Sequence, residues 1–216
     1  MIKTDHKKWA AFVFDIYLRR LLKKSFYDFR IINELPAFDY SKSIIVTPNH
    51  FSWWDGFFIY WANKKLFNRK LYVLMLEEQL KRYWFFKKLG CYSIDLNDSR
   101  KMIVSLKYTM DLLLKPNNLV TIYPQGEIQP YDEKHIVLKE GLDFIAKKSA
   151  VDFHILPIAF KIHYANERLP IVYARFGKLI NSKDVAVNPQ LFKDEFINNL
   201  DLINSEYSTS NFKSIL

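Results

Sequence analysis

Cysteine is almost absent from this chain of 216 residues, since Cys91 is the single one. One thiol excludes an internal disulfide and a cysteine-rich metal site, and it fits a reducing compartment, so we expect a cytoplasmic protein. The spacing of His135, His154 and His163 suggests no metal site either. The sequence also contains no internal repeat, Gly-rich phosphate loop, P-loop or Gly-x-Ser-x-Gly elbow. These absences exclude the enzyme classes that depend on such motifs.

Long apolar runs are missing as well. No stretch of about 18 uncharged apolar residues occurs, and the first residues are not followed by an uninterrupted apolar region of signal-peptide length. We therefore expect a protein that does not span a membrane. A hydrophobic content of 50% and an aromatic content of 17% are nevertheless enough for one domain with a sizeable core.

The amino-terminal segment combines an apolar face with positive charge. Phe14, Tyr17, Leu18 and Leu21 follow the spacing of one helical face, and residues 1–30 hold eight lysines or arginines and three aspartates, a net charge of +5 out of the +9 of the chain. This pattern predicts an amphipathic basic helix, which either lies on an anionic membrane surface or packs its apolar face on the domain, or does both. We predict a basic helical segment over residues 1–30 and a single domain over residues 31–216.

The rest of the chain alternates buried strands with helices. Strands are predicted at residues 44–47, 71–76, 119–123, 153–160 and 170–177, and helices at residues 53–62, 100–115, 138–146 and 189–204. This order indicates an α/β fold with a mixed, mostly parallel central sheet flanked by helices. Pro157 favours an edge or bulged position for its strand, because proline donates no ladder hydrogen bond. Gly141 inside a helix suggests close packing there.

The stretch from Asn49 to Asp55 follows the first of these strands. Ser52 stands three residues before Asp55, as in a capping box, so a helix is expected from Trp53. His50 then lies at the carboxyl end of a strand, where open α/β sheets place their ligand crevice. A histidine beside a carboxylate is suited to accept a proton from a hydroxyl near neutral pH. The alternative is structural: Asp55 serves only the capping box, and His50 is an ordinary turn residue.

This stretch resembles the His-x4-Asp block of the glycerolipid acyltransferase family, whose best-known members acylate lysophosphatidic acid. Further blocks follow in order between residues 44 and 160. Residues 90–96 resemble the family block Gly-x-x-Phe-Ile-Asp-Arg, residues 123–128 resemble Phe-Pro-Glu-Gly-Thr-Arg, and residues 156–158 resemble Val-Pro-Val. The resemblance implies an acyltransferase in which His50 deprotonates the acceptor, which attacks a thioester directly, while Asp55 orients His50 and stabilises its imidazolium.

Two arginines that meet the acceptor phosphate in the family are replaced here by Leu96 and Ile128. Gln125 stands in place of a glutamate, and Glu127 adds an acid where the family has threonine. Arg100 or Lys101 supplies the missing charge, or else serves the first turn of a helix capped by residue 97, 98 or 99. We therefore expect a hydroxyl or amine acceptor other than lysophosphatidic acid, such as a glycosylated or phenolic lipid, a carotenoid glycoside or an aminolipid. The residues that the resemblance implies for acceptor or donor binding are Asn49, Ser52, Tyr123, Pro124, Gln125, Gly126, Glu127 and Arg100.

The donor implied is acyl-CoA or acyl carrier protein, as a co-substrate and with no bound cofactor; both are anionic, which suits a basic protein. We expect a peripheral enzyme on the inner face of the membrane, without a nucleic-acid partner. Three alternatives stay open: an acyltransferase specific for lysophosphatidic acid, an acyl thioesterase, and a non-catalytic basic module that binds membrane or nucleic acid. Residues 81–88, an aromatic block between basic residues, fit the lipid interface, base stacking or core packing.

Overall fold

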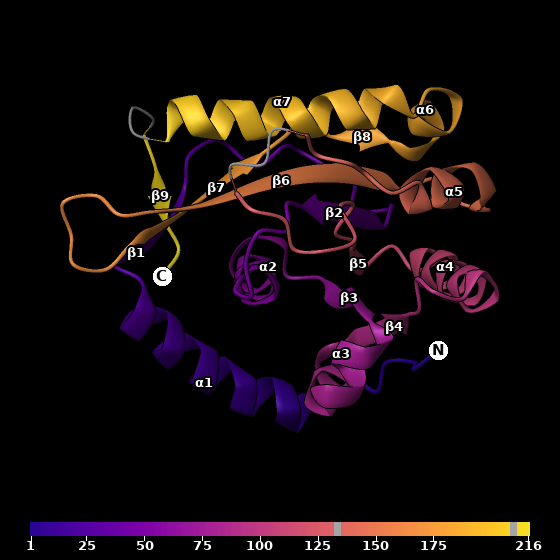
Figure 1. Cartoon of the computed structure of the whole chain (residues 1–216), viewed down its shortest axis with the longest axis horizontal. Helices are drawn as coiled ribbons and strands as arrows, with labels where there is room; N and C mark the ends of the chain where they lie inside the picture. The colour runs from indigo at the N-terminus through magenta and orange to yellow at the C-terminus, as the bar shows by residue number, and fades with distance from the viewer. Residues whose placement is uncertain (132–134, 208–210) are drawn as a thin grey trace.

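The computed structural model describes residues 1–131, 135–207 and 211–216 (Figure 1). Its strands are β1 (Asp28–Ile31), β2 (Ile44–Pro48), β3 (Lys70–Leu76), β4 (Cys91–Ile94), β5 (Asn118–Thr121), β6 (His154–His163), β7 (Ile171–Phe176), β8 (Ile180–Asn181) and β9 (Lys213–Ser214). Its helices are α1 (Lys8–Ser25), α2 (Asp55–Ala62), α3 (Glu77–Arg82), α4 (Ser99–Leu113), α5 (Gly141–Lys148), α6 (Ser182–Val187) and α7 (Gln190–Glu206), with a π-helical turn η1 (Asn63–Phe67) and a 3-10 helix η2 (Trp84–Leu89).

One sheet joins all the strands, in the order β4-β3-β5-β2-β6-β7-β1-β9, with β8 paired to β6. The neighbours from β4 to β6 are parallel, as are β1 and β7, whereas β6 pairs antiparallel with β7 and β8. The predicted mixed, mostly parallel α/β fold is thus confirmed. The carboxyl ends of β2, β5, β3 and β4 consequently meet at one edge of the sheet.

Helices cover both faces of the sheet, and α1 and α7 lie on opposite sides of it (Figure 1). On one face the core contains Phe14 and Leu18 of α1 and Phe58 and Trp61 of α2. On the other face it contains side chains of α4, α5 and α7, among them Leu106, Ile145 and Phe196. Strands β2 and β5, and most of β6 and β7, are buried on both faces, which is why they read as continuous apolar runs.

Two expectations about β6 and α5 were wrong. β6 is central, between β2 and β7, although Pro157 favoured an edge. Pro157 lies where β6 changes partner, because residues 154 and 155 pair with β8 and the pairing with β7 begins at residue 158, so the missing N–H falls at a gap in the ladder. Helix α5 begins at Gly141 rather than at residue 138, so the glycine occupies the first turn and not the interior.

Helix α1 has two apolar faces. Ala10, Phe14, Leu18 and Leu22 are buried against the domain. The outward side exposes the large apolar residues Trp9, Phe12, Val13, Ile16 and Tyr17 in its first half, and the exposed basic residues Arg19, Arg20, Lys23 and Lys24 in its second half. In the aromatic block that follows α3, Phe85 and Phe86 pack against the core, whereas Trp84 is exposed. Among the described residues, no helix combines the length and the apolar character needed to cross a membrane.

Candidate active site

The turn after β2 carries the two catalytic candidates. Ser52 accepts a hydrogen bond on Oγ from the Trp54 N–H at 2.9 Å, which shapes the turn that enters α2. Asp55 is the first residue of α2, so the helix begins two residues later than predicted. The Asp55 carboxylate reaches back to the Ser52 N–H at 2.9 Å, as the acid of a capping box does.

The same carboxylate holds His50. The Nδ1–H of His50 donates to Asp55 Oδ2 at 2.8 Å, and the Phe51 N–H donates to that oxygen at the same distance. Asp55 is thus a partner of His50 as well as of the Ser52 N–H, but the capping box is incomplete, because the Ser52 hydroxyl binds the Trp54 N–H and Trp54 itself precedes the helix. The Asp55 side chain is fully buried, and burial raises its pKa although the hydrogen bond from His50 opposes this. The His50 side chain keeps 23% of its surface exposed, so its ring is open to solvent on one side.

The main chain of His50 is braced by residues distant in sequence. Gln125 accepts the His50 N–H on Oε1 at 2.5 Å and donates through Nε2 to Gln129 at 2.8 Å. The Gln129 N–H in turn donates to the His50 carbonyl at 2.9 Å. The side-chain amide of Asn49 binds both backbone groups of Phe160, at 2.7 and 3.0 Å. Asn49 and Gln125, predicted as binding residues, thus use their amides to position the turn.

Tyr123 lies against the candidate catalytic histidine. Its ring centroid is 4.3 Å from that of His50, with the rings tilted by 30°. The Tyr123 hydroxyl is buried without a hydrogen-bond partner among the described residues, and burial raises its pKa well above the usual value. Pro124 is buried, and its carbonyl accepts the Lys139 N–H at 2.8 Å. Residues 123–125 therefore form the wall beside His50.

A cavity of about 320 Å³ opens beside this wall, over the ends of β3 and β4. It is lined by Leu76, Glu77, Glu78, Lys81, Ile94, Asp95, Leu96, Asn97, Lys101, Gly126, Glu127 and Lys139. Of the predicted binding residues, Gly126 and Glu127 belong to it. Both follow Gln125, whose side chain contacts the His50 N–H, whereas the cavity lining in the described part of the chain includes neither His50 nor Asp55.

Arg100 is not brought into this cavity. It is exposed in the first turn of α4, where its N–H binds the capping side chain of Asp98, while its neighbour Lys101 lines the cavity and pairs with Asp95 at 3.1 Å. Sequence reasoning missed Lys81 and Lys139, which line it too, and Gln129. No local pattern marks Gln129 and Lys139, because they reach the site through contacts with His50, Gln125 and Pro124. Lys81 pairs with Glu77 within α3, and only the position of α3 at the cavity distinguishes it from other helical lysines.

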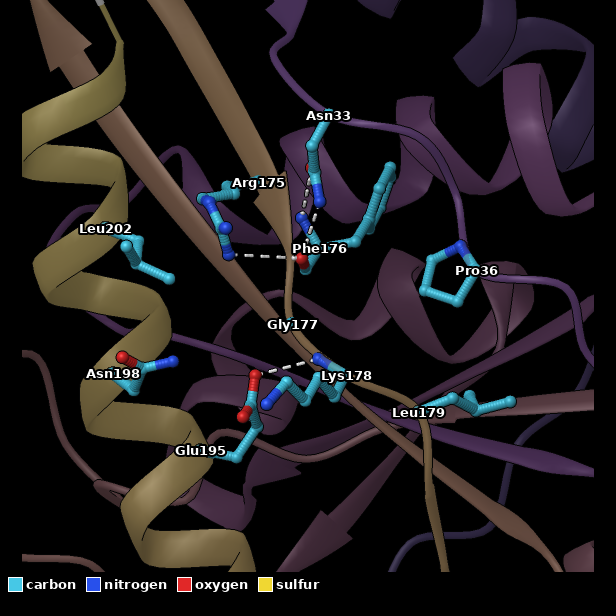
Figure 2. Close-up of a pocket in the computed structure, with 10 residues that line it drawn as sticks. All are labelled: Asn33, Pro36, Arg175, Phe176, Gly177, Lys178, Leu179, Glu195, Asn198 and Leu202. Carbon is cyan, nitrogen blue, oxygen red and sulfur yellow. Dashed lines mark hydrogen bonds between the residues drawn. The ribbon is translucent and has the colours of Figure 1, made fainter.

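A second cavity, of about 390 Å³, lies between α7 and the segments that follow β1 and β7 (Figure 2). There Asn33 binds both backbone groups of Phe176, and Glu195 accepts the Lys178 N–H at 2.8 Å. None of the predicted site residues lines this cavity.

The comparisons with known proteins point to one family. The profile of the family described as Acyltransferase matches residues 27–161, which include the His50 turn and the wall beside it. No curated protein sequence gives a significant match. Among solved structures, the fold is similar to that of the 1-acyl-sn-glycerophosphate (LPA) acyltransferase PlsC from Thermotoga maritima, with a TM-score of 0.62 and 18% identity over 91% of this chain and 79% of that chain. At this identity the likeness concerns the fold alone.

Proposed function

Because this chain belongs to the acyltransferase family, we propose that it transfers a fatty acyl group from acyl-CoA or acyl carrier protein to a lipid-like acceptor at a membrane surface. The observation that carries the proposal is the 2.8 Å hydrogen bond between His50 Nδ1 and the buried carboxylate of Asp55. A carboxylate only accepts, so Nδ1 carries the proton and Nε2 presents its lone pair. His50 is thereby arranged as a base.

In the proposed reaction, His50 Nε2 takes the proton of the acceptor hydroxyl or amine as that group attacks the thioester carbonyl carbon. The C–S bond then breaks, and the leaving thiolate takes the proton from the imidazolium. Asp55 stabilises the imidazolium between the two steps, and the brace from Gln125 and Gln129 holds the histidine main chain in place. A general base of this kind contributes about 10² to 10⁴ in rate.

We propose that the acceptor is not lysophosphatidic acid. Leu96 lines the cavity where the family has a phosphate-binding arginine, and it offers no charge. Ile128 replaces the second arginine, and Glu127 introduces a carboxylate into the cavity wall. A carboxylate repels a phosphate dianion, whereas an arginine binds it through paired hydrogen bonds. Lysophosphatidic acid stays the second candidate, because three lysines, Lys81, Lys101 and Lys139, also line the cavity.

We further propose that α1 holds the enzyme on the inner face of an anionic membrane. The outward apolar residues of its first half suit insertion among lipid chains, and each basic residue of its second half contributes about 1 kcal/mol near anionic headgroups. The exposed Trp84 and Trp53 have the side chain favoured at lipid interfaces. Peripheral binding would bring the site to its lipid-like acceptor.

The test is thiol release from acyl-CoA and from acyl carrier protein, with mass spectrometry of the acylated product. Wild type and His50→Ala are compared, and His163→Gln serves as a control histidine at the end of β6. We expect His50→Ala to lose at least about 10²-fold in turnover while it stays folded, and His163→Gln to keep its activity. Unchanged turnover in His50→Ala would refute the mechanism.

The acceptor arms of the same assay separate the candidates. Product formed with a phosphate-free lipid extract and not with lysophosphatidic acid agrees with the proposed acceptor class. Product formed with lysophosphatidic acid alone means that the cavity lysines bind its phosphate. Free fatty acid without acylated product would identify a thioesterase instead.

A further inference from the structure

The cavity over the ends of β3 and β4 is lined by charges of both signs. Glu77, Glu78, Asp95 and Glu127 provide carboxylates, and Lys81, Lys101 and Lys139 provide ammonium groups. Two of the lysines are already paired inside the wall, Lys81 with Glu77 at 2.9 Å and Lys101 with Asp95 at 3.1 Å. The hydrogen bond from Lys81 is the largest cause that lowers the pKa of Glu77 to about 2, so this carboxylate stays ionised.

Glu78, Glu127 and Lys139 differ from these pairs. None of the three forms an ion pair within the described parts of the chain. Their charges are therefore available to a ligand in the cavity, and they include both signs. Glu127 and Lys139 both line the cavity at the turn that follows Gln125.

Lys139 is held in place by its backbone and its stem. Its N–H donates to the Pro124 carbonyl, and its side chain lies over Gly126, where an added Cβ would come within 3.1 Å of Lys139 Cγ and 3.3 Å of Cε. Gly126 also has a φ of +77°, a conformation that other residues rarely adopt. This turn therefore leaves room for the lysine stem, which carries the ammonium group along the edge of the cavity.

We infer that the acceptor headgroup is zwitterionic, with an ammonium group bound by Glu127 and Glu78 and a singly charged anionic group bound by Lys139. The inference rests on the proposed acyltransferase function and names the class of its acceptor. The anionic group is either a phosphodiester or a carboxylate, since Lys139 recognises the charge that both share. These three side chains are exposed, so water solvates them in the free enzyme, and a headgroup with one cation and one anion matches their two signs. A phosphate dianion would instead meet two carboxylates for one unpaired lysine.

The experiment compares acceptors that share one acyl chain and differ in the headgroup. In mixed micelles, kcat/KM is measured for lysophosphatidylethanolamine, for a monoacylated amino-acid lipid with a free carboxylate, for lysophosphatidic acid and for monoacylglycerol. The full chain is used as wild type, Glu127→Gln and Lys139→Met. Glu34→Gln and Lys115→Met, which remove exposed charges outside the cavity, are the matched controls. Calorimetric titration of each acceptor without donor measures binding independently of turnover.

We expect the wild type to prefer one of the zwitterions, and which of the two it prefers identifies the anionic group. Glu127→Gln should lower kcat/KM for that zwitterion about tenfold relative to lysophosphatidic acid, and Lys139→Met should lower it about tenfold relative to monoacylglycerol. The controls should leave these ratios unchanged.

Two results would overturn the headgroup inference and leave the proposed function intact. In the first, transfer depends on His50 but the wild type prefers lysophosphatidic acid or monoacylglycerol. In the second, neither variant changes the kcat/KM ratios between acceptors. Zwitterion binding that Glu127→Gln weakens, without thiol release on any acceptor, would overturn the proposed function and keep the headgroup assignment.

Discussion

Replacing Asn49 by alanine removes both side-chain hydrogen bonds that join the turn after β2 to Phe160 of β6. β2 ends at Pro48, and Asn49 continues the contact with β6 through its backbone N–H, which binds the Ile158 carbonyl, and through its side chain. Alanine keeps the first of these. Asn49 is 4% exposed, and Phe160 is fully buried, so water cannot take over either bond. An unpaired buried N–H or carbonyl costs about 1 to 3 kcal/mol, so losing both partners should lower the unfolding free energy by about 2 to 6 kcal/mol.

Asn33→Ala is a matched control within the same sheet. The Asn33 amide binds both backbone groups of Phe176, at 2.8 and 2.9 Å, the same pattern as that between Asn49 and Phe160. Asn33 is only half-buried, and it lies in the second cavity, away from His50 (Figure 2). Phe176 is buried like Phe160, but both it and Asn33 line the second cavity, from which water can reach their polar groups, so we expect Asn33→Ala to cost about 1 kcal/mol.

Urea unfolding followed by tryptophan fluorescence measures both variants, and thiol release measures their activity. Asn49→Ala should also lower kcat about tenfold or more, because His50 follows directly and small displacements of a base are costly. Asn33→Ala should keep kcat. Equal losses of unfolding free energy in the two variants would refute the argument from burial, and unchanged kcat in Asn49→Ala would refute a positioning role.

Four further predictions concern separate features. Asp55→Asn should keep the turn but lower kcat by about 10² to 10⁴, because the charge that stabilises the imidazolium is lost, and wild-type kcat would contradict this. Tyr123→Phe should raise the unfolding free energy by about 1 kcal/mol, since a buried unpaired hydroxyl is removed, and a lower melting temperature would argue that the hydroxyl has a partner. The double variant Phe12→Ser and Ile16→Ser should weaken sedimentation with anionic vesicles at least tenfold, and unchanged sedimentation would exclude α1 as the anchor. The Cys91 thiol, whose pKa burial raises to about 12, should react with a disulfide reagent at pH 8 only after unfolding, so rapid labelling of the native chain would contradict its burial.

Much of the sheet could be predicted from the sequence, because β2, β5, β7 and most of β6 are buried on both faces and read as apolar runs. β3 reads as an apolar run as well, although only Leu71 and Tyr72 of it are buried. β1 and β4 were not predicted as strands. Each has four residues, and β1 contains Asp28 and Arg30, so neither gives a clear pattern of its own. They become strands through pairing with β7 and β3. The prediction of an edge position for Pro157 was wrong for a related reason. The missing N–H is tolerated because β6 has no partner at residue 157 between β8 and β7, and this depends on how the whole sheet is paired.

The candidate site, like the sheet, could be predicted only in part from the sequence. His50 and Asp55 are five residues apart in one turn, and their spacing alone suggested the pair. The division at residue 30 between a helical segment and a domain stays a prediction.

Among the site residues, Gln129 and Lys139 gave no signal in the sequence, because a glutamine or a lysine in a connecting segment is ordinary until the fold brings it beside His50 or Gly126. Arg100 was favoured over Lys101 among the binding residues, and only the helical phase of α4 decides which of these neighbours faces the cavity.

The His50–Asp55 pair is local in sequence, whereas the contacts that hold its turn in place are not. The pair spans five residues, whereas the contacts of Gln125 with His50 and of Asn49 with Phe160 span 75 and 111 residues. A partly unfolded chain can keep the local turn after β5 and β6 have separated from β2, but the turn is then no longer held toward the cavity. On heating, activity should therefore be lost when β5 and β6 separate from β2, before the helices unfold. Turnover therefore reports whether β5 and β6 are still paired with β2.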